Sequence, residues 1–130
     1  MKKVLAVLLL STSLAHAQSQ PKLTNPSPKL ITTGLTYQQI LPLNQGRGSL
    51  TIQNNQTNTD NCWLLVGGPW QAGDTTATSR TVAGQALTAV QASILLTPAL
   101  PYTRYYPYVP SDQILGTCQS TNDSLYVDTQ

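Results

Sequence analysis

The stretch 102–118, YTRYYPYVPSDQILGTC, decides how this chain of 130 residues folds in our interpretation. It holds four of the six tyrosines and the second of the two cysteines. Aromatic residues are enriched in strands, but a strand that contains Pro107 and Pro110 cannot keep a central place in a sheet. We therefore expect an edge strand, or one that bends out of its sheet. In such a strand one face would carry Tyr102, Arg104, Tyr106 and Tyr108 and the other Thr103 and Tyr105.

Short strand-like segments flank this stretch on both sides. Residues 50–54 alternate between apolar and polar, whereas residues 62–66 are more continuously apolar. Residues 93–96, 113–118 and 125–127 have the same character, and turn-forming residues separate them. We expect 50–54 and 62–66 to pair as an antiparallel hairpin. The spacing predicts an all-β fold, a small antiparallel β-sandwich or barrel of about six to eight short strands over residues 46–130.

The middle of the chain has a weaker pattern. Residues 71–85 are small and polar, which predicts a long loop. Residues 86–91 fit either a helical turn or a strand, and the neighbouring β-like segments favour a strand.

The first 17 residues have the form of a secretory signal. Lys2 and Lys3 precede an apolar run, and Ala15-His16-Ala17 forms a small-residue cleavage pattern. The run is shorter than the roughly 20 residues that span a bilayer, so the mature chain has no expected transmembrane segment. We expect export to the periplasm, to the cell surface or out of the cell. The alternative is an apolar N-terminal arm.

Residues 18–45 read as an extended arm, because prolines interrupt any regular element. Within it, the apolar pieces 30–32 and 40–43 could add to a sheet as edge strands. Attachment or spacing is one role for this arm, and a disordered leader is the alternative.

The charge balance excludes several classes of partner and activity. Beyond residue 17, five Lys and Arg residues balance five Asp residues, so there is no basic patch for nucleic acid or an anionic membrane. The chain has no glutamate, and its only histidine, His16, lies in the signal segment. No nucleophile elbow of the Gly-x-Ser-x-Gly kind occurs. We therefore expect no enzyme activity and no cofactor.

The two cysteines, Cys62 and Cys118, would reach an oxidising compartment if the chain is exported. A disulfide between them is the natural interpretation, and two buried free thiols are the alternative. Two cysteines without a histidine or a second pair cannot complete a tetrahedral metal site, so no metal is expected.

Binding is the more promising role. The candidate surface consists of aromatic side chains and one arginine: Trp70, Tyr102, Arg104, Tyr105, Tyr106 and Tyr108. Such side chains suit a protein interface or a stacked sugar ring, although aromatic residues in strands often belong to the core. The expected partner is a protein or a surface glycan, and a second copy of the chain is also a candidate.

Three segments carry a resemblance: RGSLTIQNN at 47–55, SILLTPALPYTRYYPYVPSD at 93–112, and TCQSTNDSLYVDTQ at 117–130. Together they resemble small β-sandwich domains of bacteriophage and prophage virion accessory, or decoration-type, proteins. The resemblance implies a structural or binding role without catalysis, and a location in the virion.

Three hypotheses follow. The first is a non-enzymatic structural or interaction protein of phage type that docks through its tyrosine-rich strand. The second is an exported carbohydrate-binding or surface-binding module of a bacterium. A small inhibitor-like or secreted effector protein is a third.

Overall fold

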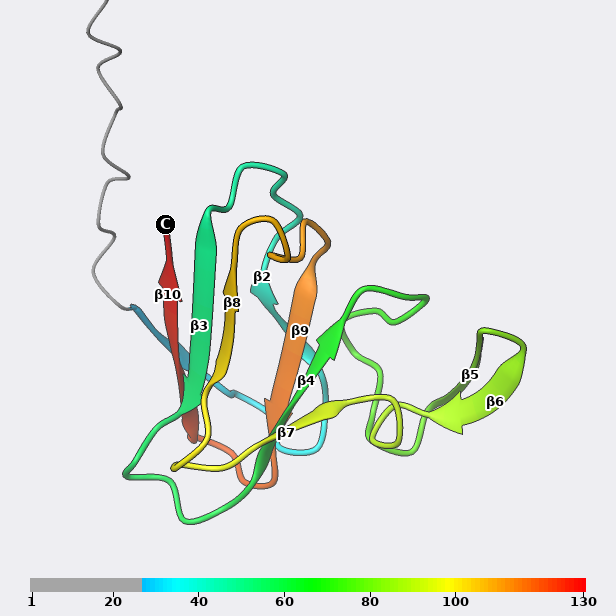
Figure 1. Ribbon diagram of the computed structural model, residues 1–130. Coiled ribbons are helices and arrows are strands. Elements are labelled where there is room, and N and C mark those ends of the chain that lie inside the picture. The colour runs from blue at the N-terminus through cyan, green and yellow to red at the C-terminus, as the bar shows by residue number, and fades with distance from the viewer. Residues whose placement is uncertain (1–26) are drawn as a thin grey trace, which may run out of the picture.

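A computed structural model describes residues 27–130, which form three antiparallel sheets and no helix (Figure 1). The expected signal at 1–17 and the start of the arm lie outside the described residues. The all-β class that the sequence predicts is confirmed.

The first sheet has the strand order β1-β10-β3-β8. Its members are β1 Ser27–Leu30, β3 Ser49–Asn54, β8 Tyr102–Tyr105 and β10 Ser124–Thr129. The alternation expected for residues 50–54 is present, because β3 buries every second side chain. The edge position expected for the strand that begins at Tyr102 is present, since β8 pairs with β3 alone. The end of the 102–118 stretch forms a separate strand, β9, in the interior of the second sheet.

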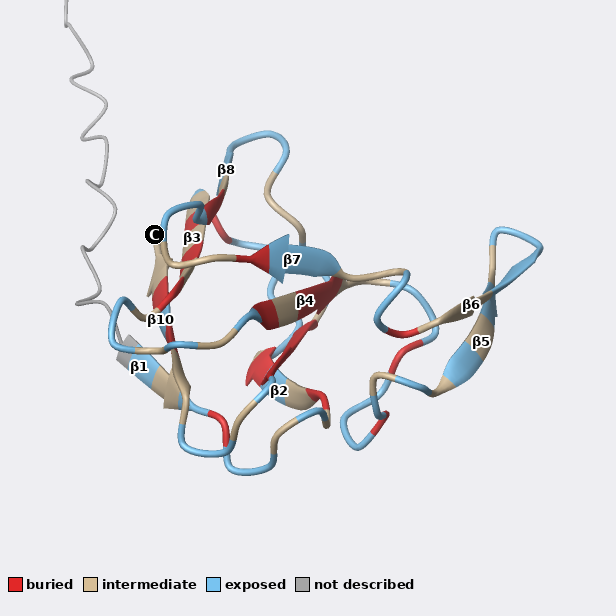
Figure 2. Ribbon diagram, turned by 90° about the horizontal axis from the view of Figure 1, so that it is seen from below, coloured by how far each residue is buried: buried red, intermediate tan, exposed pale blue. Residues whose placement is uncertain are grey.

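The second sheet has the order β2-β9-β4-β7. Its members are β2 Gln38–Leu41, β4 Cys62–Val66, β7 Ile94–Leu96 and β9 Ile114–Cys118. The two four-stranded sheets lie face to face (Figure 2), and buried residues of both sheets form one core. The core between them contains Ile31, Ile40, Leu50, Ile52, Cys62, Leu64, Leu96, Tyr102, Ile114, Cys118, Leu125 and Val127.

The expected hairpin of 50–54 with 62–66 is wrong. β3 pairs with β10 and β8 in the first sheet, whereas β4 pairs with β9 and β7 in the second. The seven residues between them cross from one sheet to the other, and no tight turn forces the strands together. Asn54, fully buried, fixes this crossing by donating from Nδ2 to the carbonyl of Asp60 at 2.8 Å.

β9 is buried along its whole length, because both faces of the second sheet are covered. On the outer face a second apolar cluster forms from Tyr37, Leu65, Trp70, Ala89 and Leu115. On the inner face Gly116 allows the two sheets to approach: a Cβ there would lie 2.6 Å from Ile40 Cγ1 and 2.9 Å from Leu125 Cδ1. The continuously apolar character of 62–66 follows from the same two-sided burial.

Residues 27–45 belong to the sandwich. Two edge strands are present in this part of the arm, β1 beside β10 and β2 beside β9. They begin two or three residues earlier than the segments 30–32 and 40–43 that the sequence indicated. Ile31 and Tyr37 are fully buried, so the described part of the arm contributes to both apolar clusters.

The long loop expected at 71–85 is only partly correct. β5 Ser79–Val82 and β6 Gln85–Thr88 form a hairpin that projects from the sandwich (Figures 1 and 2). Its turn places Ala83 and Gly84 at φ 49° and 81°, the left-handed conformation that a two-residue hairpin turn requires. The strand favoured for 86–91 is confirmed up to Thr88.

Within residues 27–130 there is no helical segment of the length and apolarity needed to cross a bilayer.

Candidate binding surface

Tyrosines gather where β8 leaves its sheet. The strand ends at Tyr105, and the chain then turns, with the Tyr108 amide donating to the Tyr105 carbonyl at 2.8 Å. The amide of Tyr106 donates to the Gly48 carbonyl at 2.9 Å, and the Tyr106-Pro107 peptide bond is cis. We call residues 105–108 the tyrosine turn.

The three rings of the tyrosine turn are exposed. The exposed fraction is 68% for Tyr105, 81% for Tyr106 and 79% for Tyr108. Tyrosine is usually part buried in a folded protein, so three adjacent exposed rings are an unusual use of aromatic side chains.

Two of the residues predicted for this surface belong to the core instead. Trp70 is 4% exposed and packs with Tyr37 and Leu65 on the outer face of the second sheet. Tyr102 is 8% exposed and lies opposite Ile52 in the core between the sheets. Strand aromatics often pack inward, and these two satisfy the need for large core side chains in a chain without phenylalanine.

Arg104 shares a face with Tyr102, as expected, and covers it. Its guanidinium carbon lies 4.4 Å from the Tyr102 ring centroid, a cation–π contact at the rim of the sandwich. The expectation that Tyr106 and Tyr108 continue this face is wrong, because the strand ends at Tyr105. Of the predicted residues, Tyr105, Tyr106 and Tyr108 lie together in the turn, and Arg104 precedes it.

Arg47 fixes the loop that follows the tyrosine turn, a role that the sequence did not reveal. The loops after β2 and β8 lie at the same end of the sandwich (Figure 1). Arg47, which is 7% exposed, donates from Nη1 to the carbonyls of Pro110 at 2.7 Å and Asp112 at 3.1 Å. Its Nη2 donates to the Pro42 carbonyl. Burial lowers the pKa of Arg47 from its usual value, but a guanidinium stays charged in proteins.

A hollow of about 320 Å³ adjoins the same loop. It is lined by Gln39, Leu43, Gly67, Gly68, Asp112 and Gln113. Asp112 is exposed and supplies the only charge of this lining, and the side chain of Leu43 is largely exposed. The segment that follows the tyrosine turn therefore contributes Asp112 and Gln113 to a small hollow with one acidic group.

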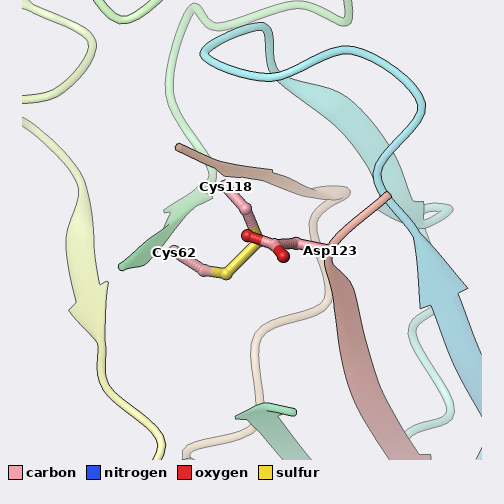
Figure 3. Close-up of side chains that lie close together, drawn as sticks. All are labelled: Cys62, Cys118 and Asp123. Carbon is pink, nitrogen blue, oxygen red and sulfur yellow. A yellow bond between two sulfur atoms is a disulfide. The ribbon is translucent and has the colours of Figure 1, made fainter. Parts of the chain in front are cut away.

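The expected disulfide is present. Cys62 and Cys118 lie opposite each other on β4 and β9, with an S–S distance of 2.02 Å. The side chain of Asp123 lies next to this bond (Figure 3), and the three ligand-type atoms are within 4.8 Å of one another. While the disulfide is intact neither sulfur is a thiolate, so this group lacks the ligands of a zinc site.

Asp123 has an unfavourable environment for its charge. Burial raises the pKa of Asp123, and the negative charge of Asp60 raises it further. Its Oδ2 receives no hydrogen bond from the described residues. Asp74 is in the opposite situation: hydrogen bonds from Arg80 Nε at 3.0 Å and Nη2 at 2.8 Å lower the pKa of Asp74. This pair holds the β5–β6 hairpin to the sandwich.

Comparisons with protein families, curated proteins and solved structures find no match to this chain.

Proposed function

We propose that this chain is a non-enzymatic binding module that docks on a partner protein through the tyrosine turn. The observation that carries the proposal is the exposure of Tyr105, Tyr106 and Tyr108 on a turn next to the loop that Arg47 fixes.

Tyrosine suits such a surface for physical reasons. Its ring buries a large area and its hydroxyl forms a hydrogen bond, while only two side-chain torsions lose their freedom. The backbone of the turn is held in place by the hydrogen bond from the Tyr106 amide to the Gly48 carbonyl. The hydrogen bonds from Arg47 hold the segment that follows. A backbone that is already ordered has less entropy to lose when a partner binds.

The three rings supply roughly half of the area that a specific complex buries on one partner. An aromatic side chain buries about 150–250 Å², so three rings that are more than two-thirds exposed offer roughly 450 Å². A protein interface of standard size buries about 800 Å² on each partner. Leu43 and Asp112, on the two loops at the same end, can supply part of the remainder.

The disulfide is consistent with an oxidising, exported environment. Within this proposal, the resemblance to phage accessory domains supports a structural or interaction role, in a virion or at a bacterial surface. The lack of glutamate, and of histidine beyond residue 17, supports a role without catalysis.

Site-directed photo-crosslinking tests the proposal. The photoreactive residue p-benzoylphenylalanine is placed at position 106 or 108 in the full chain, in the organism or particle that carries it. A control places it at Gln85, beside the exposed turn of the β5–β6 hairpin.

We expect one defined protein adduct from positions 106 and 108 and none of the same mass from position 85. If the adduct is a second copy of the chain, the docking surface serves self-association. The proposal fails if positions 106 and 108 yield no protein adduct, or if position 85 yields the same one.

A further inference from the structure

The outer face of the first sheet differs from that of the second. The second sheet is covered by the cluster around Trp70 and Leu65, whereas the outward side chains of β3 and β10 remain partly or fully exposed. The register places Tyr126 of β10 between Pro28 of β1 and Gln53 of β3. Tyr126 is 42% exposed, so its ring stands on this face.

Two adjoining hollows lie on this face and share Gln53 and Tyr126. One, of about 320 Å³, is lined by Gln53, Asn55, Gln56, Thr57 and Tyr126. The other, of about 220 Å³, is lined by Thr51, Gln53, Tyr126, Val127 and Asp128. Tyr126 therefore borders both hollows, and we call the two hollows together the depression.

The lining is rich in groups that donate and accept hydrogen bonds. The Asn55 side chain donates from Nδ2 to Ser124 Oγ at 2.8 Å, and its Oδ1 accepts from the Thr57 amide at 3.1 Å. Gln53 donates from Nε2 to the Pro98 carbonyl at 3.2 Å, which leaves its Oε1 as an acceptor. Gln56 is exposed, and its amide forms no hydrogen bond within residues 27–130.

The charge of the lining selects among ligands. It contains no lysine or arginine and a single carboxylate, that of Asp128. Nucleic acids and acidic sugars would meet a negative charge without a positive one, so they are disfavoured. A large apolar protein surface would leave the amides and hydroxyls without partners, which is costly. A neutral ligand with many hydroxyl groups fits these constraints.

We propose that this depression binds a neutral oligosaccharide. One sugar ring lies on the face of Tyr126, and its hydroxyls bond to Gln53 and Gln56, as well as to Asp128 at the far side. The inference does not rest on the tyrosine turn, because none of its residues lines the depression.

Affinity electrophoresis tests it. The full chain is run through gels containing amylose, dextran, laminarin, mannan or hydroxyethylcellulose. The variants are Tyr126→Ala, Tyr126→Phe and Gln56→Ala, with Tyr106→Ala in the tyrosine turn as the matched control. Urea unfolding establishes which variants are folded.

We expect at least one polysaccharide to retard the wild-type protein. Tyr126→Ala should weaken the retardation about ten-fold, while Tyr126→Phe and Tyr106→Ala retain it. No retardation by any of the five, or equal retardation of Tyr126→Ala, would overturn the proposal. If Tyr126→Ala does not fold, unchanged retardation of Gln56→Ala overturns it instead. A loss confined to Tyr106→Ala would place the sugar at the tyrosine turn, and the proposal would again be wrong.

Discussion

The Nη1 atom of Arg47 donates to the carbonyl oxygen of Pro110 at 2.7 Å, across 63 positions of sequence. The same guanidinium reaches Asp112 and Pro42, so one buried cation connects the loop after β2 with the loop that follows the tyrosine turn. Three backbone carbonyls therefore depend on a single side chain.

Arg47→Met should destabilise the protein by about 3 kcal/mol, because it leaves three part-buried carbonyls without their donor. Arg47→Lys should recover only part of this loss, since an ammonium cannot reach three acceptors in the plane of a guanidinium. Urea unfolding measures both. Arg104→Ala serves as the control and should cost about 1 kcal/mol or less, because it removes one exposed cation–π contact. Equal losses at the two arginines would contradict the role assigned to Arg47.

Replacing both Cys62 and Cys118 by serine should lower the free energy of unfolding by about 4 kcal/mol. The two residues are 56 positions apart, and the disulfide removes the freedom of that loop from the unfolded chain. Urea unfolding of the oxidised wild-type protein, the reduced wild-type protein and the double variant provides the measurement. The expectation fails if reduction leaves the midpoint unchanged.

Gly116→Ala should cost about 1–3 kcal/mol, because a new methyl group would overlap Ile40 and Leu125 between the sheets. Gly46→Ala is a matched control, since its nearest neighbour would be Asn44 Oδ1 at 3.5 Å. Thermal unfolding of the two variants should separate them clearly. Similar melting temperatures would mean that the sheets are less tightly packed at Gly116 than we describe.

Asp123 and Asp74 should change stability with pH in opposite directions. The raised pKa of Asp123 means that its charging opposes folding, so its contribution falls as pH rises from about 3.9 through the folded pKa. The lowered pKa of Asp74 gives stability that is present above about pH 3.9 and lost as pH falls through the folded pKa. At pH 7, Asp123→Asn should therefore be more stable than wild type and Asp74→Asn less stable.

Unfolding curves between pH 2 and pH 7 test this pair of variants. Both differences from wild type should shrink toward pH 2, where the native carboxyl groups are protonated too. A stabilising effect of Asp123→Asn that persists unchanged at pH 2 would show that its cause is not the buried charge.

Local sequence was sufficient for much of the fold. The alternation of 50–54 and the apolar run 62–66 identify two strands, because a strand buried on one face alternates between apolar and polar residues and a strand buried on both faces is apolar throughout. The pairing of the strands could not be predicted from local sequence. β3 takes its neighbours from 102–105 and 124–129, and nothing near residue 54 indicates this. The β5–β6 hairpin was missed because alanine rarely occupies the left-handed conformation found at Ala83.

The binding surface was predictable only in part. Tyrosine density beside prolines located the tyrosine turn, but it could not separate the exposed Tyr106 from the buried Tyr102. Composition alone also failed for Trp70, whose neighbours in the core come from distant segments. Arg47 was missed because its acceptors are backbone carbonyls, which any residue provides and which leave no pattern in the sequence.

The central claim is that the tyrosine turn docks on a partner protein, and the most direct measurement is calorimetric. The partner identified by crosslinking at position 106 is titrated with the wild-type protein and with the double variant Tyr106→Ala/Tyr108→Ala. Both proteins must first show the same midpoint of urea unfolding. We predict that the double variant binds the partner at least about 100-fold more weakly than the wild-type protein, because two central tyrosines are removed from the interface. Affinities within about two-fold of each other, less than 0.5 kcal/mol apart, would contradict the claim.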